Sequence, residues 1–189
     1  ISHLKEALEI NRQIGNKRSE GLNLGNLGNV YKELGQYEKA SEYFKAAIEL
    51  ATQIGVKRNE GIFLGNLGDL FLQQEKWEEA KQILELSSDI CETINHPAHH
   101  AFRGSLAFVK AILGDIEQAR SLIEYSDNKL VSVPTEHGKF LCKKAKVLHI
   151  ANQTNKATQA LEQAKNIAKE LNAKPDSEFG KLITEAEQF

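Results

Sequence analysis

Three histidines and a cysteine are the first residues in this sequence whose chemistry could build a site. His96, His99 and His100 lie within five residues of one another, and Cys91 comes shortly before them. Imidazole and thiolate groups are borderline-soft ligands that bind zinc and other transition metals. A helical register would bring at most two of these four residues together, and no carboxylate follows in step. The segment is therefore predicted to be a solvated helix start, and we expect no metal site.

Two pairs of glycines have the spacing of a phosphate-binding loop. Gly25 and Gly28 form one GxxG pair, and Gly65 and Gly68 form the other. A phosphate loop places such glycines after a strand and before a lysine, whereas both pairs here fall inside predicted helices. The sequence also shows no nucleophile beside a base, no paired carboxylates in an apolar setting and no zinc-binding helix. We therefore expect that the protein is not an enzyme and needs no cofactor.

The composition narrows the classes of partner. The chain has 189 residues, 41% hydrophobic and 26% charged, with a formal net charge of -2. Without a basic excess nucleic acid is not expected as a partner, and without a run of 18 apolar residues a membrane is not expected either. Cys91 and Cys142 form no disulfide framework, which favours a cytoplasmic protein. No methionine occurs, even at position 1, so we expect a segment of a longer protein.

An internal repeat organises the sequence. The run QIGNKRSEGLNLGNLGNVYKELGQYEKA, which begins at Gln13, returns forty residues later as QIGVKRNEGIFLGNLGDLFLQQEKWEEA, which begins at Gln53. Such a period is typical of solenoids, in which helical hairpins stack on one another. We predict a single domain over 1–189, with a partial repeat in 1–18, repeats at about 19–58, 59–96, 97–133 and 134–172, and a capping helix at about 175–189.

These units resemble the tetratricopeptide repeat family. The signature positions hold Leu24, Leu27, Gly28, Tyr31, Gly35, Tyr37, Ala40, Phe44 and Ala47 in the first full unit, and Leu64, Leu67, Gly68, Phe71, Trp77, Ala80 and Leu84 in the second. Glu75 replaces the turn glycine of the second unit, and two weaker units follow. The forty-residue form is similar to the repeats of kinesin light chains, spindle-orientation adaptors and bacterial signalling proteins. The resemblance implies an all-α fold, a right-handed solenoid of antiparallel helical hairpins.

The hairpins divide the chain into ten expected helices. We predict them near 1–14, 19–34, 37–54, 59–74, 77–94, 97–113, 116–128, 135–151, 154–171 and 176–188. Pro97 and Pro134 suit first helical turns, and the run 174–178 offers a cap for the last helix. Small residues let helix backbones approach closely and so predict the crossing points, at Gly28, Gly68, Ala107 and Ala145 on the first helices and Ala40, Ala80, Ala119 and Ala157 on the second.

The family resemblance also implies a binding groove, lined by the first helices of successive hairpins. Asparagine suits such a groove because its amide both donates and accepts hydrogen bonds and can hold a peptide backbone. Alternatively, the asparagines cap or bridge neighbouring helices within the stack. By the family pattern, the candidates that face the groove are Asn26, Asn29, Asn66, Asp69, Gln73, Phe108, Lys139, Lys143 and Lys146.

Some of these candidates suggest a kind of ligand. Lys139, Lys143 and Lys146 share a helical face and could attract an acidic segment, although a row of lysines is more often only a solvated face. Phe108, with Ile112 one turn later, forms an apolar patch that would suit a hydrophobic anchor of the ligand. A shift of one residue in this degenerate repeat would instead bury the patch in the hairpin core.

One groove position is small in every unit, and Gly25, Gly65, Gly104 and Cys142 occupy it. These residues either leave room for a ligand backbone or only ease helix packing. The same position is usually basic in repeats that clamp the C-terminal carboxylate of chaperones, so that ligand class is disfavoured. We expect an interaction module that binds a protein or peptide on its concave face, within a larger signalling or regulatory protein. The alternatives are homo-oligomerisation through the uncapped N-terminal end and a peptide-sensing regulatory domain.

Overall fold

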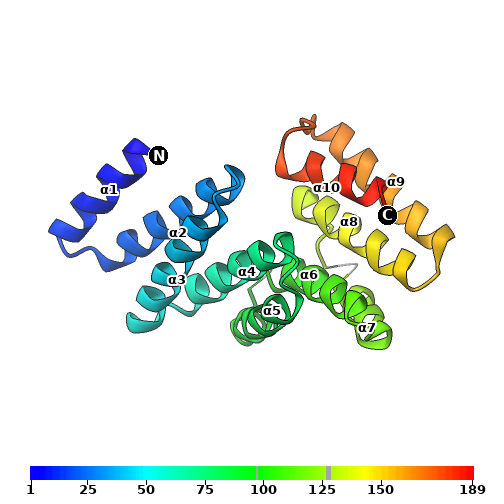
Figure 1. Ribbon diagram of the computed structural model, residues 1–189, viewed down its shortest axis with the longest axis horizontal. Coiled ribbons are helices and arrows are strands. Elements are labelled where there is room, and N and C mark those ends of the chain that lie inside the picture. Colours follow the sequence, from blue (N-terminus) through cyan, green and yellow to red (C-terminus); the bar gives the residue numbers. More distant parts are fainter. Residues whose placement is uncertain (97, 127–128) are drawn as a thin grey trace. The chain divides into compact units, whose positions relative to one another are not determined.

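The computed structural model describes residues 1–96, 98–126 and 129–189, and of His99 the backbone alone. Within this part the chain forms ten helices (Figure 1). Their bounds are α1 Ser2–Gln13, α2 Lys17–Glu33, α3 Tyr37–Gln53, α4 Lys57–Gln73, α5 Trp77–Thr93, α6 Ala98–Ile112, α7 Ile116–Ser126, α8 Pro134–Ile150, α9 Thr154–Glu170 and α10 Glu178–Glu187.

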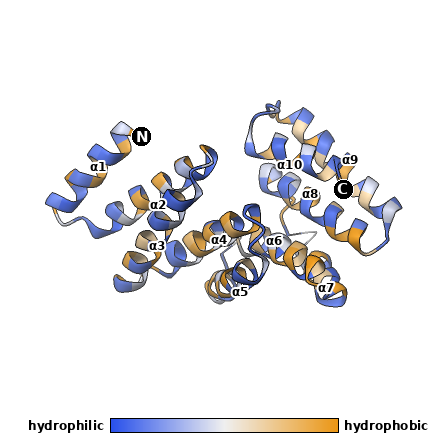
Figure 2. Cartoon of the chain, in the orientation of Figure 1, coloured by the Kyte–Doolittle hydropathy of each residue, from blue (hydrophilic) through white to orange (hydrophobic). Residues whose placement is uncertain are grey.

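The all-α fold class predicted from the sequence is confirmed. Every expected helix is present, and its described ends lie within two residues of the predicted ones. The prediction for Pro97 and for the end of the seventh helix at 127–128 lies outside the described residues. In Figure 2 the helices carry alternating hydrophobic and hydrophilic bands, as expected when one face of each helix is buried against a neighbour.

The chain divides into two compact units, residues 1–96 and 97–189. In the first unit, α2 pairs with α3 and α4 with α5, while α1 packs on α2 and α3 packs on α4. In the second unit, α6 pairs with α7 and α8 with α9, α6 packs along α8, and α10 lies against α8 and α9. The first helices of the hairpins are therefore α2, α4, α6 and α8, and the second helices are α3, α5, α7 and α9.

A residue in the left-handed conformation follows the end of most helices. A positive φ lets the chain leave the helix while the last carbonyls still accept hydrogen bonds, and glycine takes this conformation without a steric penalty. Glu75, which replaces the turn glycine, nevertheless has a φ of 56°. The same geometry therefore recurs despite the change of residue, at Gly15, Gly35, Gly55, Glu75, Asn95, Gly114, Asn152 and Asn172.

Side chains and a proline mark several helix starts. The Asn16 side chain accepts a hydrogen bond from the backbone N–H of Ser19, at 3.1 Å. Pro134 lies in the first turn of α8, as predicted. Ser177 caps α10 by accepting from the backbone N–H of Gly180, also at 3.1 Å. The cap that the run 174–178 predicts for the last helix is therefore confirmed, and the helix itself begins at Glu178.

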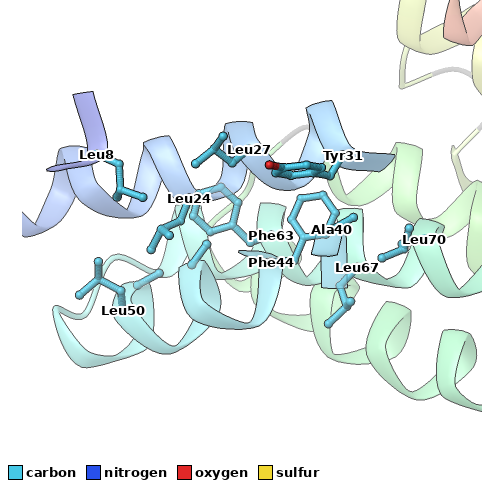
Figure 3. Packing of buried hydrophobic residues seen from close by; sticks show 12 residues of the cluster. Leu8, Leu24, Leu27, Tyr31, Ala40, Phe44, Leu50, Phe63, Leu67 and Leu70 are labelled. Carbon is cyan, nitrogen blue, oxygen red and sulfur yellow. The ribbon is translucent and has the colours of Figure 1, made fainter. Parts of the chain in front are cut away.

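The core of the first unit lies between α2, α3 and α4 (Figure 3). Phe44 of α3 is fully buried and lies directly opposite Gly28 of α2. A Cβ atom at Gly28 would be 2.6 Å from the Phe44 ring, so the two helices can cross at this distance only because the position has no side chain. Gly68 of α4 meets the buried Leu84 of α5 in the same way, with 2.6 Å between its ideal Cβ and Leu84 Cγ. The predicted crossing points at both glycines are confirmed.

One carboxylate joins α1 to α2 from a buried position. Glu20, in the first turn of α2, is 7% exposed. It accepts from Lys17 Nζ at 2.9 Å and from Arg12 Nε of α1 at 3.1 Å. These charged donors hold the pKa of Glu20 below its usual value despite the burial of the group.

Candidate functional site

A row of polar side chains lies on α2 and α4 of the first unit. Residues three, four and seven apart share one face of a helix, which places these side chains on the sides of α2 and α4 that do not face α3 and α5. Asn26 and Gln73 are exposed, and Asn29, Asn66 and Asp69 are half-buried. We call this set, which includes the exposed Glu33, the polar face: Asn26, Asn29, Glu33, Asn66, Asp69 and Gln73.

The hydrogen-bonding groups of the asparagine amides on the polar face are not used within the described part of the chain. Among the described residues, the side chains of Asn26, Asn29 and Asn66 form no hydrogen bond, whereas Asp69 has an interaction within the protein. None of the three amides is a helix cap, since α2 is capped by Asn16 and α4 begins after Val56. The alternative that these asparagines cap or bridge neighbouring helices therefore finds no support in the structure.

A phenylalanine from the next hairpin fills the space that Gly25 offers. The Phe63 ring of α4 packs against α2 so closely that a Cβ at Gly25 would be 2.1 Å from Phe63 Cε1. The second unit repeats this arrangement, because an ideal Cβ at Gly104 of α6 would be 2.8 Å from Phe140 Cδ2 of α8. The small residues at Gly25 and Gly104 therefore serve helix packing, and the expected room for a ligand backbone is occupied.

Two of the three candidate lysines of the second unit, Lys139 and Lys146, are paired with glutamates. Lys139 Nζ lies 3.0 Å from a carboxylate oxygen of Glu136 and 2.6 Å from one of Glu178. Burial by itself lowers the pKa of Lys139, but the charges of Glu178 and Glu136 outweigh it, and the pKa lies above its usual value. Because Glu178 belongs to α10, the acidic segment that Lys139 attracts is part of the same chain.

The other two candidate lysines are also occupied. Lys146 is 6% exposed, and its Nζ lies 2.9 Å from a carboxylate oxygen of Glu185 on α10. Lys143 donates to the hydroxyl of the buried Ser105 on α6. The three lysines do lie along one side of α8, as predicted, but they do not form the open basic face that the sequence suggested.

The expected apolar patch at Phe108 is closed in the structure. Phe108 is only 4% exposed, whereas Ile112 at 36% borders solvent. The Phe189 ring lies edge-on against Phe108 with 5.6 Å between the ring centroids, and Lys146 Nζ lies 5.1 Å from the Phe108 centroid. Phe108 is therefore covered by the segment that follows α10 and offers no open anchor point.

Sequence reasoning did not pick out the residues of α10 as partners of the candidate site. Glu178 and Glu185 each lie 39 residues after the lysine they pair with, which is close to the period of the repeat. A residue and its counterpart in the next hairpin lie side by side in a solenoid. This offset of opposite charges was therefore the signal that could have predicted the pairing.

The two cysteines are buried as free thiols. Burial raises the pKa of the Cys91 thiol, and it raises that of Cys142 to about 12, so both free thiols are protonated at neutral pH. Among the described residues no three His, Cys, Asp or Glu side chains gather in a way that could hold a metal ion; the side chain of His99 lies outside that set. None of the described helices is long and apolar enough to cross a membrane.

The repeat signature is confirmed by comparison with known families. The tetratricopeptide repeat family matches residues 1–53 and 24–93. Residues 1–93 carry tetratricopeptide repeats. The match covers the units in which the glycine and aromatic signature is strongest, and the structure continues the antiparallel hairpins of these repeats through α9. A search of curated protein sequences finds no significant match.

Solved structures of helical repeat proteins resemble between 84% and 99% of the chain. The apo form of RapI superposes with a TM-score of 0.70 at 14% identity, over 99% of this chain and 75% of RapI. BtubC (BKLC) from P. vanneervenii gives a TM-score of 0.65 at 16% identity, over 84% of this chain and 66% of that protein, just under two thirds of its length. A Podosopora anserina protein described as a kinesin light chain with nearly identical TPR-like repeats gives 0.58 at 17% identity, over 92% of this chain and 90% of that one. At these identities the likeness shows the fold.

Proposed function

We propose that the chain is a protein–protein interaction module that binds an extended segment of a partner protein on the polar face of α2 and α4. Tetratricopeptide repeats generally mediate interactions between proteins and are typically scaffolds without catalytic activity. The observation that carries the proposal is the set of asparagine amides that form no hydrogen bond among the described residues. We further propose that the module belongs to a larger signalling or regulatory protein of the cytoplasm, where its free cysteines would remain reduced.

The chemistry of the polar face favours a peptide backbone as ligand. Each amide presents a donor and an acceptor, which together match the N–H and C=O groups of an extended chain. Asn26 and Asn66 occupy equivalent places in repeats forty residues apart, on helices that the Phe63 ring holds in close contact. The two amides can therefore hold one segment at two points along its backbone, while Asp69 and Glu33 favour a ligand without acidic side chains nearby.

Replacing the three asparagines tests this proposal. The ligand would first be selected by displaying random extended peptides against the unmodified chain. Asn26→Ala, Asn29→Ala and Asn66→Ala together are expected to weaken the selected peptide at least about tenfold, because each lost amide leaves peptide backbone groups without a partner. Fluorescence anisotropy measures the change, and thermal unfolding checks that the fold is kept.

A matched control uses amides on the second helices. Gln53 of α3 and Gln82 of α5 are exposed and lie outside the polar face. The variant Gln53→Ala/Gln82→Ala is expected to bind the peptide like the unmodified chain. If both variants bind equally well, or if both lose binding, the polar face of α2 and α4 is not the binding surface.

Self-association is a second candidate function, and the open face of α1 favours it. Ile10 is 50% exposed and Ile14 68%, whereas Leu50, the equivalent of Ile10 in the next repeat, is 8% exposed. In α3 this face is covered by α2, and in α1 no described helix covers it. A second copy that packs on this face would bury the two isoleucines.

The mass of the protein in solution tests self-association. If α1 mediates it, sedimentation equilibrium will show a mass that rises with protein concentration, and Ile10→Glu/Ile14→Glu will restore the monomer, because burying two carboxylates in an apolar interface is costly. A mass that stays monomeric at high concentration would remove this candidate and leave peptide binding unaffected.

A further inference from the structure

In the second unit, the surface equivalent to the polar face is covered by α10 of the same chain. Phe108 of α6 and Lys146 of α8 hold the repeat positions that Asn29 and Asp69 hold in the first unit, each directly after the small crossing residue. In the first unit both positions are half-buried, whereas Phe108 and Lys146 are both buried. What buries them is α10 and the residues after it, which lie beside α8 and α9 (Figure 1).

The contacts of this occupant are specific in chemistry and spacing. Glu178 and Glu185 are seven residues apart on one face of α10, and they pair with Lys139 and Lys146, which are seven apart on α8. Phe189 follows four residues after the second glutamate. Its ring lies edge-on to Phe108 at 5.6 Å and to His149 at 6.2 Å, and Lys146 Nζ lies 5.6 Å from its centroid.

The carboxylates that hold α10 to this surface are partly open to water. The side chains of Glu178 and Glu185 are 47% and 50% exposed, against 19% and 7% for Lys139 and Lys146, so water reaches and screens one partner of each ion pair. Phe189 is 43% exposed. With ten residues, α10 is also too short to be stable as a helix by itself, so it forms only while it is docked.

We propose that Lys139, Lys146 and Phe108 form a second binding surface, for an acidic helical segment of a partner protein, and that α10 is its resident and displaceable occupant. The segment carries two carboxylates seven residues apart and an aromatic ring four residues after the second. This surface is separate from the polar face of α2 and α4, so either site can fail its test without affecting the other.

The test uses the full chain and a labelled synthetic peptide of residues 174–189. In the unmodified chain the tethered α10 competes at an effective concentration in the millimolar range, so the peptide binds weakly. The release variant Phe179→Ala/Glu185→Ala removes a buried anchor of α10 and one ion pair but keeps the proposed surface. We expect the peptide to bind this variant at least about tenfold more tightly than it binds the unmodified chain.

Further variants separate a binding surface from a simple helix cap. A peptide with Glu178→Gln, Glu185→Gln and Phe189→Ala is expected to bind the release variant at least about tenfold less tightly than the natural peptide. Adding Lys146→Ala to the release variant should weaken the natural peptide similarly, whereas adding Lys156→Ala, an exposed lysine of α9, should not. Equal binding of the natural and the altered peptide would overturn the proposal, since α10 would then be held by its apolar anchor alone.

Hydrogen exchange of the unmodified chain tests the proposal without any substitution that could disturb folding. A displaceable α10 opens locally, so its amides are expected to exchange at least about tenfold faster than those of the middle of α8 and α9. Exchange of α10 at the rate of α8 would mean that it leaves only on unfolding of the unit, and that result would also overturn the proposal.

Discussion

Gly28→Ala is expected to lower the free energy of unfolding by about 1–3 kcal/mol, although alanine is the better helix former. The added Cβ would be 2.6 Å from two carbon atoms of the Phe44 ring. Phe44 has no exposed surface and packs in the core of the first unit, so the ring cannot turn away without disturbing its neighbours. The strain exceeds the gain in helix propensity, which is about 1 kcal/mol.

Gly21→Ala in the same helix is the matched control, and it is expected to raise the free energy of unfolding by up to about 1 kcal/mol. Its Cβ would be 3.7 Å from Leu50 Cδ2, an ordinary van der Waals contact. Urea unfolding followed by circular dichroism measures both variants against the unmodified chain. If both substitutions stabilise the protein, the crossing of α2 and α3 does not depend on the missing side chain of Gly28.

Phe63→Ala is expected to lower the free energy of unfolding by about 3–5 kcal/mol, because it empties the space between α2 and α4. Gly25→Ala should cost about 1–3 kcal/mol, since the new methyl group would meet the Phe63 ring at 2.1 Å. The double variant should lose less free energy of unfolding than the two single variants added together, by about 0.5–3 kcal/mol, because the methyl group then enters the space that the ring has left.

A double-mutant cycle with urea unfolding measures this coupling. The additive control is Gly25→Ala combined with Phe140→Ala, because Phe140 belongs to the other unit and meets Gly104 instead. The pair Gly104 and Phe140 should repeat the coupling seen for Gly25 and Phe63. Strict additivity at Gly25 and Phe63 would show that the glycine does not serve the contact between successive hairpins.

The local pattern of the sequence was sufficient to predict the helices and their pairing. The forty-residue repeat, the turn residues between helices and the small residues at Gly28 and Gly68 act over one hairpin, so each can be interpreted without knowledge of distant segments. The turn between α4 and α5 keeps this geometry without a glycine, because Glu75 takes the left-handed conformation that glycine takes elsewhere in the chain. The polar face of α2 and α4 follows from the same periodicity, since every helix turns a side away from its hairpin partner.

Contacts between successive hairpins decide whether each candidate residue is exposed or covered. Gly25 offers a space in the sequence, but only the packing of α4 on α2 shows that Phe63 fills it. Lys146 and Phe108 have the spacing of groove residues, yet they are buried because α10 returns onto α8 with Glu185 and Phe189. Periodicity determines which side of a helix a residue occupies, whereas the identity of the side chain that covers it depends on segments 36 to 81 residues away, which only the tertiary structure brings together.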